Sequence, residues 1–368
     1  MTNHHLRFNQ AARLYFVKTV IAFGVLSAAG VAIADSLVLK SQGSFFVGGR
    51  TITTDALTGT ASGFLNTEIN TGSITVDQMY VQYEVPESGD KHLPVVMVHG
   101  CCLSAKSYET TPDGRMGWNE YFLRKGRAVY LPDQVSRARS GFDATIYNEI
   151  RLGKRPAADM PSIRTASHEL AWTLFRFGPT MGTAFPNEQF PVEAMEEFGK
   201  QVIPDLNAGL AENNPTWTNL SGLAIKLRGA VLMGHSESGF FPERTALVNP
   251  SNLKGLITIE TECPTTLTSA QISTLAGIPI LVIFGDHLGD VPGMADLWPA
   301  RFKTCQQVVD QVNAAGGDAV MMHLPKYGQF GNSHMLMQDK NNLQVADLIL
   351  KWIDDHVEGK QKHANEHR

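Results

Sequence analysis

Five consecutive residues, Gly234-His235-Ser236-Glu237-Ser238, place a serine between two small residues, directly after the apolar run 230–233. A helix-like stretch follows from Phe240. In a sharp turn between a buried strand and a helix, a serine hydroxyl is exposed for attack on an acyl carbon, and the positions two residues away on either side must be small. The spacing therefore predicts Ser236 as a nucleophile. Ser238 is the rival, but its own neighbours at that spacing fit the requirement less well.

A serine nucleophile needs a general base, and the sequence offers His334 for this role. His334 lies in the segment Gly331-Asn332-Ser333-His334-Met335, after the last apolar run, 319–322, and before the final helix-like segment. His323 lies inside or next to that apolar run, and the side chain of His235 is expected to point away from the nucleophile. We therefore expect His334 to accept the proton of the serine.

Backbone N–H groups beside the serine must hold the negative oxygen that develops during the attack. The residue after the nucleophile, Glu237, supplies one of them, and a loop after an earlier strand supplies the other. The segment His99-Gly100-Cys101-Cys102 directly follows the apolar run 94–98. We therefore predict an oxyanion hole made of the backbone N–H groups of Cys101 and Glu237.

A carboxylate must orient the histidine, and the residues alone leave its identity open. Asp286 and Asp290 follow the apolar run 280–284, which is the usual place for this acid. Glu260 and Glu262 instead follow the preceding run, 256–259. Position alone slightly favours the aspartates.

The segments that must position these residues alternate between short apolar runs and helix-like stretches. The runs read as strands buried on both faces, which is typical of a mostly parallel sheet flanked by helices. Two earlier runs, 44–49 and 74–85, indicate strands that are antiparallel. Residues 145–225 do not follow this alternation, because they contain many prolines and aromatic residues. The segment is also too long for a simple connection. We predict that they form a helical cap inserted over the edge of the sheet.

The N-terminus has the pattern of a secretory signal peptide. Three basic residues precede the apolar run 19–34, which ends in Ala32-Ile33-Ala34. Cleavage there would remove residues 1–34 and leave residues 35–368 as a single secreted or periplasmic domain; the alternative is an uncleaved membrane anchor. Loss of the three basic residues takes the formal net charge from −5 to −8. An acidic surface argues against nucleic acids and anionic membranes as partners.

Four cysteines remain after cleavage, and an even number in an exported protein suggests disulfides. We expect the pairs Cys101–Cys102 and Cys263–Cys305, although the first would close a strained ring; the alternative for the adjacent cysteines is two free thiols. No Cys or His spacing typical of a metal site is present. No metal or cofactor is therefore expected.

These motifs, together with 111–118 and 284–287, resemble those of the esterase 713 family, a group of bacterial serine esterases in the α/β-hydrolase superfamily. The resemblance covers nearly all of the chain after residue 34 and implies an α/β-hydrolase fold and a homodimer. It also implies bonded adjacent cysteines, and a triad acid at Glu260, with Glu262 and Asp286 as alternatives. Two departures are that segment 260–262 is one residue shorter than in the family and that Glu237 replaces a glutamine.

The combined pattern predicts an exported serine esterase that cleaves small-molecule carboxylic esters through an acyl-enzyme. An amidase, a lactonase or a lipase could use the same three residues. A binding module that retains the fold without chemistry is the alternative from another class, but such modules usually lose part of the triad.

Overall fold

The computed structural model describes residues 36–55, 71–88, 91–206 and 214–359. Within these ranges one sheet contains eight strands in the order β1-β2-β4-β3-β5-β6-β7-β8. The predicted signal peptide lies outside the described residues. The strands are β1 (Leu39–Thr54), β2 (Gly72–Pro86), β3 (Val95–Val98), β4 (Val129–Pro132), β5 (Ala230–His235), β6 (Leu253–Ile259), β7 (Ile280–Phe284) and β8 (Ala319–His323).

The sheet is parallel from β4 to β8, and β1 and β2 pair in antiparallel fashion at one edge. Strands β3, β5 and β7 bury every one of their residues, which is why they appear in the sequence as unbroken apolar runs. The predicted mostly parallel sheet flanked by helices is confirmed, and so is the antiparallel pair that precedes it.

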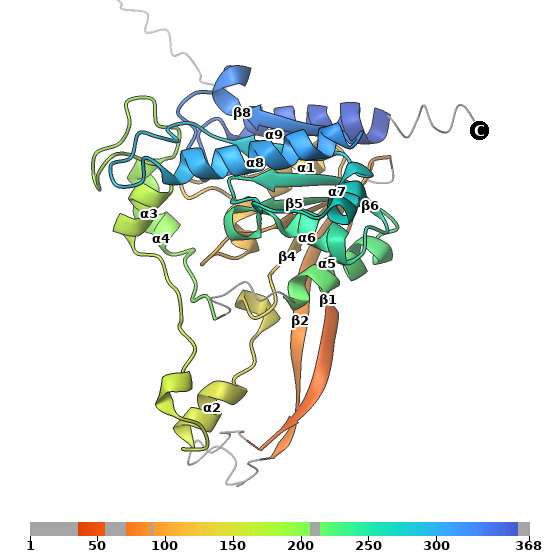
Figure 1. The fold of residues 1–368 in the computed structure, drawn as a ribbon, viewed down its shortest axis with the longest axis vertical. Coiled ribbons are helices and arrows are strands. Elements are labelled where there is room, and N and C mark those ends of the chain that lie inside the picture. Colours follow the sequence, from red (N-terminus) through yellow and green to blue (C-terminus); the bar gives the residue numbers. More distant parts are fainter. Residues whose placement is uncertain (1–35, 56–70, 89–90, 207–213, 360–368) are drawn as a thin grey trace, which may run out of the picture. The chain divides into compact units, whose positions relative to one another are not determined.

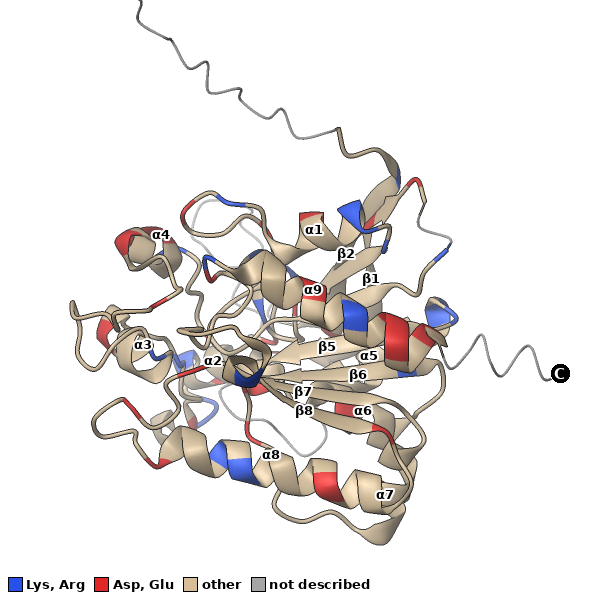
Figure 2. Ribbon diagram, turned by 90° about the horizontal axis from the view of Figure 1, so that it is seen from above, with Lys and Arg blue, Asp and Glu red and all other residues tan. Residues whose placement is uncertain are grey.

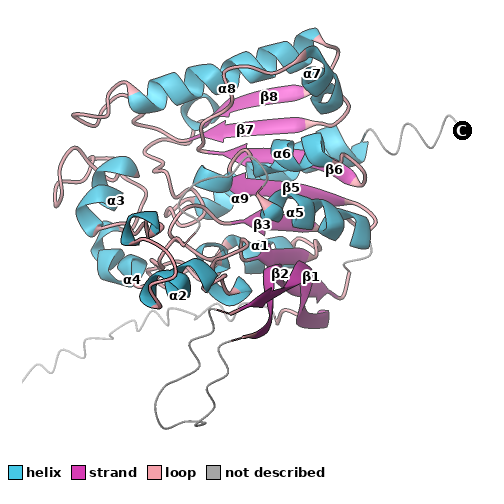
Figure 3. Cartoon of the chain, turned by 60° about the horizontal axis from the view of Figure 1, so that its bottom comes forward, coloured by secondary structure: helices cyan, strands magenta, loops and turns pink. Residues whose placement is uncertain are grey.

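Helices cover both faces of the sheet (Figure 3). One apolar cluster packs helices α1 and α9 on one face, and a second packs α5, α6, α7 and α8 on the other. The described α-helices are α1 (Trp118–Arg124), α2 (Thr145–Arg151), α3 (His168–Leu174), α4 (Met195–Gly199), α5 (Pro215–Lys226), α6 (Phe241–Val248), α7 (Ser269–Ala276), α8 (Leu297–Ala314) and α9 (Asn342–Trp352). Acidic and basic residues are interspersed along α8 and α9 (Figure 2).

The long segment between β4 and β5 contains α2, α3, α4 and α5. Helices α3 and α4 lie together beyond one end of the strands, and α2 lies apart from them, near the far end of β1 and β2 (Figures 1 and 3). Helix α5 instead packs its buried residues, such as Leu220 and Leu223, into the cluster on the face of the sheet. The insertion therefore ends before α5, although the sequence interpretation extended it to residue 225.

The antiparallel edge projects beyond the rest of the sheet. Only residues 81–84 of β2 pair with β4, so the remainder of β1 and β2 forms a two-stranded ribbon that runs toward α2 (Figure 1). Lys154 Nζ, which follows α2, lies 2.8 Å from the Asp55 carboxylate just after β1. Among the described helices, none is long and apolar enough to span a bilayer.

Candidate active site

Ser236 lies directly after β5, in a sharp turn that leads into α6. Its φ of +58° is a left-handed conformation that a non-glycine residue rarely adopts. The turn is so tight that a Cβ on Gly234 would lie 2.0 Å from the carbonyl oxygen of Ser238. Ser238 is fully buried and donates its hydroxyl to the carbonyl of Val98 at 2.9 Å. The turn therefore presents Ser236, while Ser238 ties the turn to β3.

The structure brings His334 to Ser236, with 2.9 Å between the imidazole Nε2 and the serine Oγ. Phe175 stacks on the imidazole with 4.9 Å between ring centroids, and Trp298 lies at 4.7 Å. The backbone N–H of His334 donates to the carbonyl of Phe175 at 2.9 Å, and its own carbonyl accepts from His235 Nε2 at 2.9 Å. The imidazole is thus fixed by its backbone and by the rings beside it.

Glu260, the first residue after β6, is the carboxylate that contacts the imidazole. Its Oε2 lies 3.2 Å from His334 Nδ1. Its Oε1 accepts from Arg176 Nη2 at 2.6 Å and from the backbone N–H of Gly285. Because β6 is the neighbour of β5 in the sheet, a residue at its end reaches the histidine that contacts Ser236.

The other carboxylates considered for this position do not contact the imidazole. The side chain of Glu262 is 68% exposed, and that of Asp290 is 60% exposed. Asp286 accepts the backbone N–H of Gly331 at 2.9 Å, so it supports the loop that holds the histidine. The structure therefore brings Glu260 to His334, and not Glu262, Asp286 or Asp290.

The charges of the pair suit proton transfer at neutral pH. Burial alone would raise the pKa of Glu260, but Arg176 and the hydrogen bond with His334 outweigh it and lower this pKa to about 2. Burial lowers the pKa of His334 to about 4, although Glu260 acts to raise it. At neutral pH the carboxylate is ionised, and the imidazole is neutral and able to accept a proton.

The predicted oxyanion loop lies directly against the serine. A Cβ on Gly100 would lie 2.7 Å from the Cβ of Ser236. His99 is fully buried, and its Nε2 accepts the backbone N–H of Gln134 at 3.1 Å, which leaves Nδ1 to donate to the carbonyl of Gly100 at 2.9 Å. Because C=O and N–H point in opposite directions in a trans peptide, this bond also fixes the N–H of Cys101.

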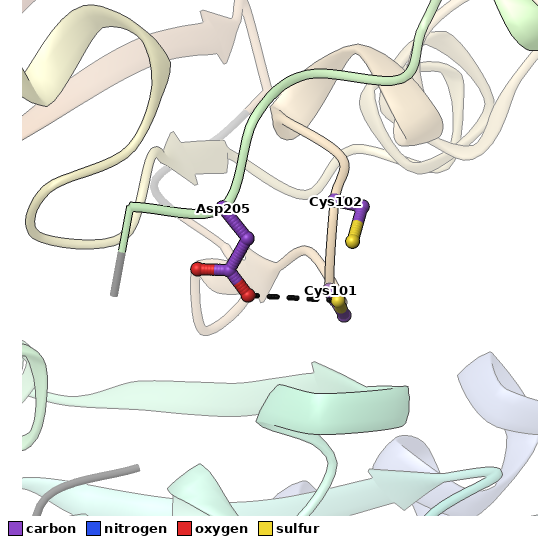
Figure 4. Close-up of side chains that lie close together, drawn as sticks. All are labelled: Cys101, Cys102 and Asp205. Atoms are coloured by element: carbon purple, nitrogen blue, oxygen red, sulfur yellow. Dashed lines mark hydrogen bonds between the residues drawn. The ribbon is translucent and has the colours of Figure 1, made fainter. Parts of the chain in front are cut away.

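Cys101 and Cys102 are free thiols in the structure, which corrects the predicted disulfide between them. Residues joined by a trans peptide have Cα atoms about 3.8 Å apart, below the usual disulfide range of about 4.4–6.8 Å. The thiol of Cys101 instead faces the buried carboxylate of Asp205, with 3.5 Å between Sγ and Oδ2 (Figure 4). Cys263 and Cys305 are bonded to each other.

Two groups of described residues bring three potential metal ligands together: Cys101, Cys102 and Asp205, and His92, Asp354 and Glu358. In the first group Arg137 Nη2 lies 2.5 Å from the carboxylate of Asp205. In the second group Arg127 contacts both carboxylates. A guanidinium thus already neutralises the acidic ligands in each group.

Two residues of the insertion, Phe175 and Arg176, hold the predicted base and acid, and the sequence interpretation identified neither. They lie outside the motifs from which the sequence interpretation was made. The available signal was chemical: Arg176 stands between two phenylalanines in an apolar stretch, and a buried arginine needs an ionic partner. That signal indicates a buried carboxylate but does not say which one.

The comparisons with known proteins agree with this architecture. No family model matches the sequence. A solved structure, described as the atomic resolution structure of a novel bacterial esterase, is 48% identical, covers 88% of this chain and 98% of that chain, and superposes with a TM-score of 0.82. A probable secreted lipase, phiG, from a fungal species (strain ATCC 74256) is 23% identical over 329 residues, which are 75% of this chain and 85% of the relative. The chain belongs to the family of that bacterial esterase, and it is an α/β-hydrolase that acts on carboxylic esters.

Proposed function

We propose that the chain cleaves its esters with Ser236 as nucleophile, His334 as general base and Glu260 as the acid that orients the base. The observation that supports this most directly is the continuous line of contacts from Ser236 Oγ to His334 Nε2, 2.9 Å, and from His334 Nδ1 to Glu260 Oε2, 3.2 Å. A serine, a histidine and a carboxylate in this order make an otherwise weak hydroxyl nucleophilic.

The reaction follows from these positions. Ser236 Oγ attacks the ester carbonyl while His334 Nε2 takes its proton, and Glu260 stabilises the imidazolium that forms. His334 then gives the proton to the leaving alcohol, which leaves an acyl-enzyme on Ser236. Water, deprotonated by the same imidazole, releases the acid and restores the serine.

The negative oxygen of each intermediate is held, in this proposal, by the N–H groups of Cys101 and Glu237. The Glu237 side chain lies next to this position, where a free negative charge would oppose the oxyanion. Burial raises the pKa of Glu237, and Arg137 acts against that rise through an ion pair with 2.9 Å between Nη2 and Oε2. The side chain is therefore neutralised either by its own proton or by Arg137, and only its backbone takes part.

The proposal extends to substrate, location and assembly. The fungal relative is described as a probable secreted lipase, which favours export here after removal of residues 1–34. The proposed substrate is a small-molecule carboxylic ester. The homodimer implied by the family resemblance stays a prediction. N-terminal sequencing of the exported protein tests the cleavage site, and light scattering tests the dimer.

The deciding experiment is hydrolysis of p-nitrophenyl acetate and butyrate by the wild type and by Ser236→Ala, Glu260→Gln and Glu262→Gln. We expect Ser236→Ala to lose activity by about 10⁴-fold or more and Glu260→Gln by about 10²–10⁴-fold. Glu262→Gln is the matched control, because the same chemical change is made two residues away on an exposed side chain.

Full activity in Glu260→Gln would reject the proposed acid, and full activity in Ser236→Ala would reject the nucleophile. A series of longer acyl chains separates a lipase from a short-chain esterase. The matching p-nitroanilides separate an esterase from an amidase.

A further inference from the structure

Two consecutive residues of the insertion contact the proposed base and acid. The carbonyl of Phe175 accepts the backbone N–H of His334, and its ring stacks on the imidazole. Arg176, which is fully buried, donates Nη2 to Glu260 Oε1 and Nε to the carbonyl of Asp286 at 2.8 Å. These two residues lie more than fifty positions before Ser236 in the chain.

The guanidinium of Arg176 is itself held in place. It lies over the ring of Trp298, with 4.6 Å from Cζ to the ring centroid. The backbone of Arg176 has a φ of +62°, a left-handed conformation that a non-glycine residue rarely adopts. One oxygen of Glu260 is occupied by Arg176 and Gly285, which leaves the other oxygen to face His334.

Other titratable groups also face this pair. Those that interact with it electrostatically are Arg301 on α8, His235 at the end of β5, His323 at the end of β8 and Asp339 before α9. Asp286 in turn interacts with His323, and Glu262 with Arg301. Among the described residues, Arg176 is the one arginine or lysine within ion-pair distance of Glu260. Its removal therefore changes the electrostatics of the pair more than removal of Arg301.

We propose that Arg176 is a positioning residue that acts through Glu260, and that it sets the lower limit of the pH range in which the enzyme works. The inference rests on the proposed function. Arg176 fixes the carboxylate so that the oxygen facing His334 does not rotate away. Its positive charge also opposes the arrival of a proton on the Glu260–His334 pair, whichever of the two groups would take it, so the base stays available in more acidic solution.

The test compares Arg176→Met, Arg176→Lys and Arg301→Met by the pH dependence of kcat/KM. The methionine keeps apolar contact with Trp298 but removes the charge. For this variant we expect the acidic limb of the pH profile, where kcat/KM falls as the pH is lowered, to move upward by about one pH unit. We also expect its kcat to fall by about 10–100-fold, with little change in KM. The lysine keeps the charge without the planar fork, so its acidic limb should stay near that of the wild type while kcat falls. Arg301→Met is the matched control and should move the limb less.

A second measurement does not depend on turnover. NMR titration of the histidines, with His334 assigned through a His334→Gln variant, should give a higher pKa for His334 in Arg176→Met than in the wild type. This shift would persist even if no ester were hydrolysed, so failure of the proposed function and failure of this inference are distinguishable.

A third measurement tests whether Arg176 acts through Glu260. The double variant Arg176→Met with Glu260→Gln should be little slower than Glu260→Gln alone. The inference is overturned if the acidic limb and the His334 pKa are the same in Arg176→Met and the wild type. It is also overturned if the methionine and lysine variants lose activity equally without any shift, because that pattern describes a residue needed only for packing.

Discussion

Gly100 shows how closely the oxyanion loop approaches the serine. A Cβ at this position would lie 2.7 Å from Ser236 Cβ and 3.0 Å from the carbonyl oxygen of His235. Real Cβ atoms do not approach other side-chain atoms as closely as 2.7 Å, so a side chain at position 100 must displace either the loop or Ser236. The glycine is therefore required by proximity to Ser236.

Gly100→Ala should lower kcat/KM by about 100-fold, because a displacement of about 1 Å is enough to spoil the alignment of nucleophile and oxyanion donors. The measurement is kcat/KM with p-nitrophenyl butyrate, with circular dichroism to verify folding. Gly277→Ala is the matched control: its Cβ would meet nothing closer than 3.4 Å. Equal activity in the two variants would mean that the loop is not part of the site.

At the scale of elements, the loop that presents His334 is organised by one buried carboxylate. Asp339 Oδ2 accepts the backbone N–H of Ser333 and the side-chain amide of Asn332, each at 2.9 Å, and Oδ1 accepts the Ser333 hydroxyl at 2.6 Å. Three donors converge on a side chain that is fully buried. The loop between β8 and α9 thus owes its shape to Asp339 rather than to regular secondary structure.

Asp339→Asn should loosen this loop, since the new amide turns a donor toward groups that already donate, and an unmet buried donor costs about 1–3 kcal/mol. Hydrogen exchange of residues 331–340 should speed up, and kcat should fall by about tenfold or more as the imidazole moves. Asp355→Asn, a change on a side chain that is 53% exposed, is the control. Unchanged exchange in this loop would contradict the role assigned to Asp339.

The strands could be predicted from sequence, and so could the candidates Ser236 and His334, which the structure brings into contact, because each has a local signal. Strands buried on both faces give unbroken apolar runs, and Ser236 and His334 follow such runs at recognisable distances. The carboxylate that contacts His334 could not be identified from position, because the ends of β6 and β7 each offer two carboxylates. Contacts made far away in sequence distinguish them: Arg176 binds Glu260, while Asp286 is occupied by the backbone of Gly331. No local pattern records either contact.

Over the whole molecule, two sets of buried groups change the stability of the fold in opposite directions as pH changes. Burial lowers the pKa of His99, His235 and His334 to between about 3 and 4, and it raises the pKa of Glu188 and Glu243 to between about 7 and 9. The histidines stay neutral where the unfolded chain is charged, so they cost stability as pH falls below about 6.5. The acids stay protonated where the unfolded chain is ionised, so they cost stability as pH rises above about 4.5. In mildly acidic solution the effects of the two sets on stability offset each other as pH changes. Above pH 7 only the destabilising effect of the buried acids continues to change with pH.

Glu243→Gln isolates one of these contributions. In the wild type this carboxyl has its pKa raised from 4.5 to about 7 by burial. The variant should gain stability over the wild type progressively as pH rises from about 4.5 to about 7, by about 1–3 kcal/mol at the upper end, and the gain should then stay constant. Urea unfolding at several pH values measures it, with the exposed Glu196→Gln as control. A gain that does not vary with pH would disprove the assignment.

The attachment of the insertion limits how ester and product can pass. If the stretch around Phe175 and Arg176 moved away in every turnover, His334 and Glu260 would lose the contacts that hold them. The geometry of the site would then be lost each time a molecule entered or left. Substrate and product are therefore expected to pass by a route that stays open, or opens, while the stretch next to the histidine remains docked.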